Sequence, residues 1–159
     1  MPQAFSVLYC RMKAKFINPA LFNLFIPISI ATHFFIPIKV LISSPFNTLG
    51  IVFILIGLVL NMVASNHLRK NQTPVDFNQP PNRLVTDGPF RFSRNPIYLS
   101  GVTVLFGIAI LLGSLVSFCF PMLLFLLLNY IYIPSEEKEM QEMFGNDYVK
   151  YKHSVRRWL

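Results

Sequence analysis

The sequence is poor in charge. Asp, Glu, Lys and Arg make up 13% of its 159 residues, against about 25% in a typical soluble domain. Hydrophobic residues make up 53%, Phe alone occurs 16 times, and the mean hydropathy is +0.51. Apolar runs of this number and length are not those of a soluble core, so we predict an integral membrane protein. A chain of this size is expected to form one domain, residues 1–159.

The sequence also lacks the signatures of several common chemistries. Its two cysteines, Cys10 and Cys119, belong to no CxxC pair, and its three histidines are scattered, so no metal site is expected. Glycine-rich phosphate or dinucleotide loops, HExxH and GxSxG are all missing. Basic residues do not interleave with exposed aromatic residues on a soluble module, which argues against a nucleic-acid partner.

Four apolar runs predict about four transmembrane helices. The runs cover residues 20–42, 48–64, 98–112 and 116–133. The dipeptide Gly113-Ser114 lies in the short gap between the last two runs, which predicts a helical hairpin with a tight turn. Glycines within the runs should permit close contact between helices: Gly50, Gly57, Gly101 and Gly107.

All charged residues except one are predicted to lie on the same side of the membrane. The amino terminus, the 65–97 loop and the carboxyl tail hold 13 of the 14 basic residues, Lys39 being the exception, and all seven acids. The positive-inside rule therefore predicts that both termini and the loop are cytoplasmic. The net charge of +7 is then explained by topology and by attraction to anionic membrane lipid.

The loop and the tail form two polar blocks, residues 82–98 and 134–158. Prolines in the loop predict an ordered, extended cap over the helix ends in place of a long helix. Pro134 and Ser135 predict the start of a separate tail helix with Ser135 as its N-cap. Apolar residues then recur at three- and four-residue spacing, typical of an amphipathic helix, with a turn expected at Gly145. The expected fold class is an all-α integral membrane helical bundle with a cytosolic cofactor cap formed by the loop and this helix.

Short motifs occur in a fixed order on the two blocks. They are Leu84-Val85-Thr86-x-Gly88-Pro89-Phe90, Arg94-Asn95-Pro96-x-Tyr98, Glu136-Glu137, Phe144-Gly145-x-x-Tyr148-x-x-Tyr151 and Val155-Arg156-Arg157-Trp158. In this order, with a helical hairpin between them, they resemble the isoprenylcysteine carboxyl methyltransferase and phospholipid methyltransferase superfamily of membrane enzymes. The resemblance covers about the last 86 residues.

The resemblance implies that S-adenosylmethionine is the methyl donor and binds between the two blocks. A buried carboxylate such as Glu136 can accept hydrogen bonds from the donor's ammonium group, and Phe90 and Tyr98 offer aromatic faces to adenine or to a cation. Carried over position by position, the family's cofactor contacts fall on Asn82, Arg83, Leu84, Val85, Phe90, Asn95, Pro96, Ile97, Tyr98 and Glu136.

Three positions depart from the carboxyl methyltransferases of this superfamily. Asn95 stands where they have His, Phe90 where they have Tyr, and Tyr132 where they have an Arg that is associated with substrate. Tyr132 and Asn129 are candidate substrate residues, while Arg94, Asn95 and Tyr98 are candidates for positioning. No catalytic residue is assigned, because methyl transfer depends on alignment and on exclusion of water.

The remaining charged residues have simpler interpretations. Glu136 and Glu137 would also suit the first turn of a helix, where the dipole favours acids. Four arginines of the two polar blocks are more simply interpreted as lipid-facing charges than as site residues: Arg83, Arg91, Arg156 and Arg157.

The function expected is S-adenosylmethionine-dependent methyl transfer to a lipophilic acceptor at the cytosolic membrane face. The acceptor could be a prenylcysteine carboxylate, a phospholipid amine or another lipophilic small molecule, and O-, N- and S-methylation all stay open. One alternative is an NADPH-dependent membrane reductase of sterol-reductase-like layout. Another is a non-catalytic four-helix scaffold that keeps a degenerate cofactor pocket. The oligomeric state is not predicted.

Overall fold

The computed structural model describes residues 20–36, 39–75 and 81–159, with the backbone alone at residues 20–22. Its α-helices are α2 (Ala20–Phe35), α3 (Leu49–Lys70), α4 (Pro96–Leu112), α5 (Leu115–Leu127) and α6 (Ile133–Ser154). Short 3-10 turns, η1 (Phe46–Thr48) and η2 (Gly88–Arg91), precede α3 and α4, and a π-helical turn, η3 (Leu128–Tyr132), joins α5 to α6. No strand occurs within the described ranges, and the prediction of an all-α fold is confirmed. The amino-terminal basic residues used in the charge argument lie outside these ranges.

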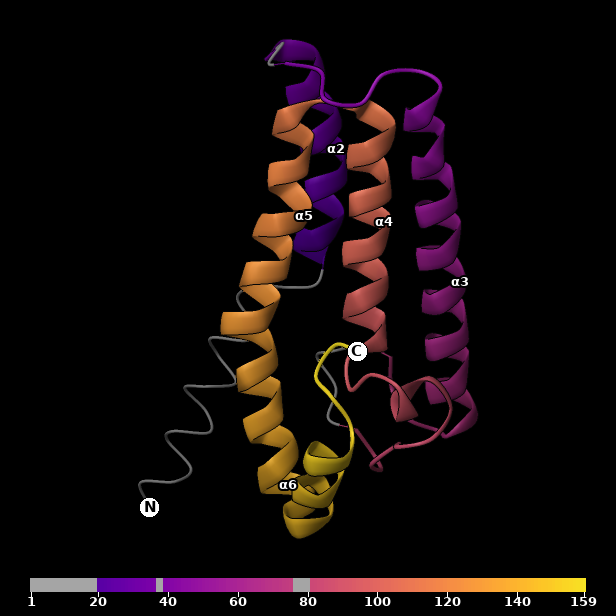
Figure 1. Cartoon of the computed structure of the whole chain (residues 1–159). Coiled ribbons are helices and arrows are strands. Elements are labelled where there is room, and N and C mark those ends of the chain that lie inside the picture. The colour runs from indigo at the N-terminus through magenta and orange to yellow at the C-terminus, as the bar shows by residue number, and fades with distance from the viewer. Residues whose placement is uncertain (1–19, 37–38, 76–80) are drawn as a thin grey trace.

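The helices run side by side (Figure 1). α3 packs against α4, and α2 packs against both α4 and α5. One end of the bundle carries the connection into α3 and the turn between α4 and α5. The other end carries η2, the start of α4, α6 and the carboxyl terminus. The two polar blocks therefore lie at the same end of the molecule.

Two helices are long and apolar enough to cross a membrane, Phe46–Lys70 and Leu115–Ser154, and Asn23–Phe35 and Pro96–Leu112 are shorter apolar helices. Large apolar side chains stay exposed along α3, for example Leu55 at 56% and Met62 at 58%. A continuous apolar surface of this kind is unfavourable in water and favourable against lipid tails.

Two of the predicted helix boundaries are wrong. The first apolar run was expected to be helical over 20–42, but α2 ends at Phe35, because Ile36 precedes a proline and such a residue disfavours helical backbone angles. The second was expected over 48–64, but α3 continues to Lys70, since residues 65–70 contain no helix breaker. The loop is correspondingly shorter than 65–97.

The predicted hairpin turn is confirmed. Gly113 ends α4 with φ of 68°, a left-handed conformation that glycine adopts without steric cost, and Ser114 is extended. The Gly113 carbonyl accepts hydrogen bonds from the amides of Leu41 (2.7 Å) and Ile42 (3.2 Å), so the turn is tied to the segment before α3.

Contact between α3 and α4 depends on glycine, as expected for Gly50, Gly57 and Gly107. A Cβ atom on Gly50 would lie 2.3 Å from the Gly107 carbonyl oxygen, and one on Gly57 would lie 2.6 Å from Val104 Cγ2. Gly101 is an exception, since a Cβ atom there would meet nothing within 4 Å.

The predicted start of a separate tail helix is wrong. α5, η3 and the part of α6 before Gly145 form one continuous rod, in which Tyr132 and not Ser135 occupies the position before α6. Proline removes one i→i−4 hydrogen bond from a helix interior, and the wide π-turn lies directly before Pro134. The expected interruption at Gly145 is confirmed, with φ of 53° and ψ of −127°, and the chain turns back there toward the base of α4 (Figure 1).

Candidate active site

A half-buried acidic residue, Glu136, lies where α4 begins and α6 begins. Pro96 occupies the first turn of α4 and places Tyr98 in the bundle, where it is 6% exposed. The Tyr98 hydroxyl donates a hydrogen bond to Oε1 of Glu136. Tyr98 and Tyr132 belong to one apolar cluster that includes Leu128. The structure thus brings together two predicted cofactor residues and one predicted substrate residue.

Glu136 has an unusual electrostatic environment. Glu136 lies in the first turn of α6, three residues after Ile133, the last residue of the apolar run. Desolvation raises the pKa of the Glu136 carboxyl to about 7, although the hydrogen bond from Tyr98 acts in the opposite direction. Among the described residues, no Lys, Arg or His lies within ion-pair distance of this carboxyl. A desolvated carboxylate that has no cation beside it favours binding of a positively charged hydrogen-bond donor.

The next residue has the opposite environment. The side chain of Glu137 is 7% exposed and is surrounded by cations. Arg157 binds it with two parallel hydrogen bonds, Nε to Oε1 at 3.0 Å and Nη2 to Oε2 at 2.9 Å. Arg94 Nη1 lies 3.0 Å from Oε1 and Lys152 Nζ lies 3.3 Å from Oε2. Desolvation would raise the pKa of Glu137, but the Arg157 hydrogen bonds and the charges of all three cations outweigh it and lower the pKa.

This cluster corrects one interpretation made from the sequence. Arg157 was interpreted as a lipid-facing charge, but its guanidinium binds Glu137. Arg156, by contrast, is exposed. Arg94, predicted to position reactants, lies 9% exposed beside Glu137 and does not contact Glu136 by any ion pair in the described part of the chain.

The carboxyl-terminal segment, Val155–Trp158, runs beside the residues that precede α4. The amide of Arg94 donates to the Arg156 carbonyl (3.0 Å), and Asn95 Nδ2 donates to the Arg157 carbonyl (3.0 Å). Ser93 Oγ donates to the same carbonyl at 3.4 Å. The side-chain amide of Asn95, a predicted cofactor contact, is thus bound to the tail.

Asn129 joins the same network from the π-turn. Its Oδ1 accepts hydrogen bonds from Trp158 Nε1 (3.1 Å) and Arg157 Nη1 (3.3 Å), and its carbonyl oxygen accepts from Arg157 Nη1 at 3.2 Å. The contact between this candidate substrate residue and the tail was not predicted from the sequence. The one signal for it was the motif Val155-Arg156-Arg157-Trp158, whose residues were not assigned to the site.

The other predicted cofactor residues are spread over the 82–97 segment. Val85 and Pro96 are buried, Leu84, Phe90 and Ile97 are half-buried, and Asn82 and Arg83 are exposed. Asn82 Nδ2 donates to the Gln72 carbonyl at 2.7 Å. No hydrogen bond or ion pair between described residues joins Asn82 or Arg83 to Glu136.

His67 is a further residue that the sequence did not single out. Its Nε2 lies 2.9 Å from Asp87 Oδ1, and this hydrogen bond lowers the pKa of Asp87. Gly88, with φ of 57°, packs against the imidazole so closely that a Cβ atom would lie 2.7 Å from it. The Phe90 ring lies 6.4 Å from the same imidazole, and the Phe90 carbonyl accepts a hydrogen bond from Tyr151 (2.6 Å). The end of α3 and the tail therefore hold the η2 turn between them.

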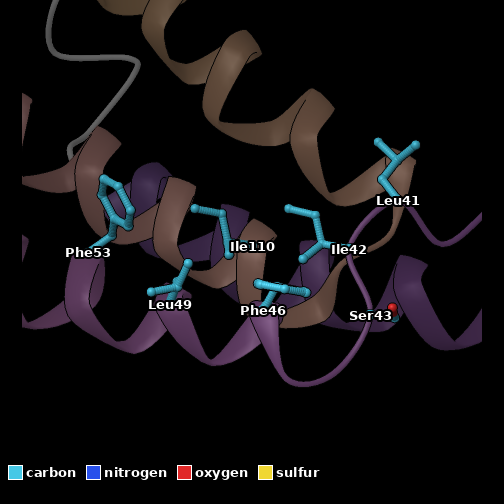
Figure 2. A pocket seen from close by; sticks show the side chains of 7 residues that line it. All are labelled: Leu41, Ile42, Ser43, Phe46, Leu49, Phe53 and Ile110. Carbon is cyan, nitrogen blue, oxygen red and sulfur yellow. The ribbon is translucent and has the colours of Figure 1, made fainter.

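A hollow of about 380 Å³ lies at the other end of the bundle (Figure 2). Its lining comes from the connection before α3, from α3 and from α4: Leu41, Ile42, Ser43, Phe46, Leu49, Phe53 and Ile110. Among these described lining residues, Ser43 is the one with a polar side chain and none carries a charge.

In the described ranges, the structure is a helical bundle with two helices apolar enough to cross a membrane. A desolvated carboxyl with no cation from these ranges beside it lies at one end of the bundle. A family model described as "Phospholipid methyltransferase" matches residues 46–147, more than half of the chain, and the chain belongs to this family. The family is part of the isoprenylcysteine carboxyl methyltransferase-like superfamily, which confirms the resemblance of the motifs. Membership implies a membrane methyltransferase activity, and family members use S-adenosylmethionine.

A second comparison adds a relative without an assigned activity. It is an uncharacterised protein of Haemophilus influenzae that is 33% identical over 63 residues, which are 40% of this chain and the whole of that protein. No solved structure matches the chain.

Proposed function

We propose that this protein transfers the methyl group of S-adenosylmethionine to a lipid acceptor at the cytosolic face of a membrane. The observation that carries the proposal is the Glu136 carboxyl, which is desolvated, bound by Tyr98 and without a cation among the described residues. Family membership supplies the reaction class.

The residues at this end of the bundle fit the donor. The Glu136 carboxylate would accept hydrogen bonds from its ammonium group, a charge-assisted contact of the stronger kind. Tyr98 fixes the orientation of that carboxylate, and the apolar cluster around Tyr132 excludes water. When bound, S-adenosylmethionine supplies an electrophilic methyl carbon on a positively charged sulfur. The remaining proposed contacts are Asn82, Arg83, Leu84, Val85, Phe90, Asn95, Pro96 and Ile97.

The topology that we propose has four membrane spans and both termini in the cytoplasm. Both polar blocks lie at one end of the bundle in Figure 1, and 13 of the 14 basic residues fall in the segments assigned to that side. This placement exposes the donor site to the cytosol and allows a lipophilic acceptor to enter from the bilayer.

The charges around the site favour an amine acceptor over a carboxylate. Arg94, Lys152 and Arg157 all bind Glu137. Tyr132 stands where the carboxyl methyltransferases have an arginine. A carboxylate acceptor would thus lie beside Glu136 without a compensating cation, whereas an amine would not. An amine must lose a proton before it attacks, and apolar surroundings lower amine pKa values in the required direction.

Calorimetry with the protein in lipid nanodiscs tests the donor site. We expect S-adenosylmethionine to bind, and Glu136→Gln to weaken binding about 10- to 100-fold, the range for one hydrogen bond to a charged group. Glu142→Gln, an exposed position further along the same helix, is the matched control and should bind like wild type. Binding of NADPH in place of S-adenosylmethionine would favour a reductase and refute the proposal.

A further inference from the structure

The direction of Glu136 depends on the π-turn before it. An α-helix rotates by about 100° per residue, and a π-turn accommodates one residue more than an α-helical turn. Every side chain that follows η3 (Leu128–Tyr132) is therefore rotated by about 100° relative to a regular continuation of α5. Without this turn, Glu136 and Glu137 would not face Tyr98 and Arg94.

Contacts from the carboxyl-terminal segment hold the π-turn from outside the helix. Arg157 Nη1 donates to both the carbonyl and Oδ1 of Asn129, while its Nε and Nη2 bind Glu137. Trp158 donates to the same Oδ1, and its ring lies 4.9 Å from Phe125 on α5. The segment thus bridges the helix before the turn, the turn itself and the helix after it.

These contacts also bear on the role of Asn129. An amide oxygen has two lone pairs, and Oδ1 of Asn129 already accepts from Arg157 and Trp158. That oxygen cannot take a further hydrogen bond from an acceptor molecule without breaking one of these. The pattern is that of a residue that holds other groups in place.

We propose that Asn129 is a positioning residue, which holds the π-turn through Arg157 and Trp158 and so keeps Glu136 directed at Tyr98. This role rests on the proposed function, since its purpose is a preformed site for the donor's ammonium group. Asn129 acts through Glu136, with which it shares no hydrogen bond or ion pair among the described residues.

Two substitutions separate positioning from simple stability. Asn129→Asp keeps an oxygen acceptor for both donors, whereas Asn129→Leu has a similar size and removes it. We expect Asn129→Leu to weaken S-adenosylmethionine binding in nanodiscs about tenfold, and Asn129→Asp to stay within about threefold of wild type. The chain contains one tryptophan, so Trp158 fluorescence reports directly on the contact and should shift to longer wavelength in Asn129→Leu only.

A third variant guards against loss of folding. Trp158→Phe keeps an aromatic ring near Phe125 and removes only the indole N–H group. It should therefore weaken S-adenosylmethionine binding by a smaller factor, about threefold. Equal donor affinity in wild type, Asn129→Leu and Trp158→Phe would refute the positioning role while leaving the donor site intact. Absence of donor binding in the wild-type protein would instead refute the proposed function.

Discussion

Replacing Glu137 by Gln should destabilise the protein strongly, because Glu137 is the shared partner of three cations. The variant keeps the size of the side chain and removes the negative charge. Arg94, Lys152 and Arg157 would then face one another around a neutral amide.

The exposure of each cation sets the size of the effect. Breaking a buried ion pair by removing one partner costs about 3–5 kcal/mol. The side chains of Lys152 and Arg157 are 40% and 30% exposed and can regain water, whereas that of Arg94 is 9% exposed and cannot. Because only Arg94 would be left buried without a partner, the loss in the free energy of unfolding should be near the lower end of this range, about 3 kcal/mol. For a chain of this size, the unfolding temperature would fall by about 6–12 °C.

Thermal unfolding in detergent, followed by circular dichroism, measures this difference. Glu139→Gln on the same helix is the control and should unfold within about 1–2 °C of wild type. A second change, Arg94→Met, should recover part of the stability in the Glu137→Gln background, since it removes the stranded cation. If Glu137→Gln unfolds at the same temperature as Glu139→Gln, the cluster does not stabilise the fold and the reasoning is refuted.

Three further predictions concern other parts of the molecule. The folded protein holds a proton on Glu136 up to about pH 7, whereas the unfolded chain releases it near 4.5, so donor-free stability should fall by about 3 kcal/mol between pH 4.5 and 8 from this group. Unfolding curves of Glu136→Gln should lack that part of the slope, and an unchanged slope would contradict the assignment. Gly50→Ala should lower the unfolding temperature because its Cβ atom would overlap the Gly107 carbonyl oxygen, whereas Gly101→Ala, with open space around it, should be neutral or slightly stabilising. A reporter fused after Gly113 should show the non-cytoplasmic side, and a cytoplasmic signal there would overturn the four-span topology.

The fold could be predicted from the sequence where one signal dominates. Long apolar runs gave the helices, and Gly113 gave the hairpin turn because only glycine adopts its φ of 68° without cost. Prediction failed where two signals compete. At Pro134, the proline suggested a helix start, but packing of the rod kept the helix continuous and moved the irregularity into the preceding π-turn.

The site was predictable only in part for a related reason. Motif order placed Tyr98 and Glu136 in one site, and the structure joins them by a hydrogen bond. Pairing between distant side chains carries no local signal, so Arg157 was assigned to lipid although it binds Glu137 twenty residues earlier. The tail contact of Asn129 was missed for the same reason.

Transfer of an isotope-labelled methyl group tests the central claim most directly. The purified protein in nanodiscs would be incubated with labelled S-adenosylmethionine and a membrane lipid extract, with a prenylcysteine panel in parallel, and products would be identified by mass spectrometry. We predict label in an amine-bearing lipid, with loss of that product in Glu136→Gln. A folded protein that binds the donor and labels neither the extract nor the panel would contradict the account and favour a non-catalytic scaffold.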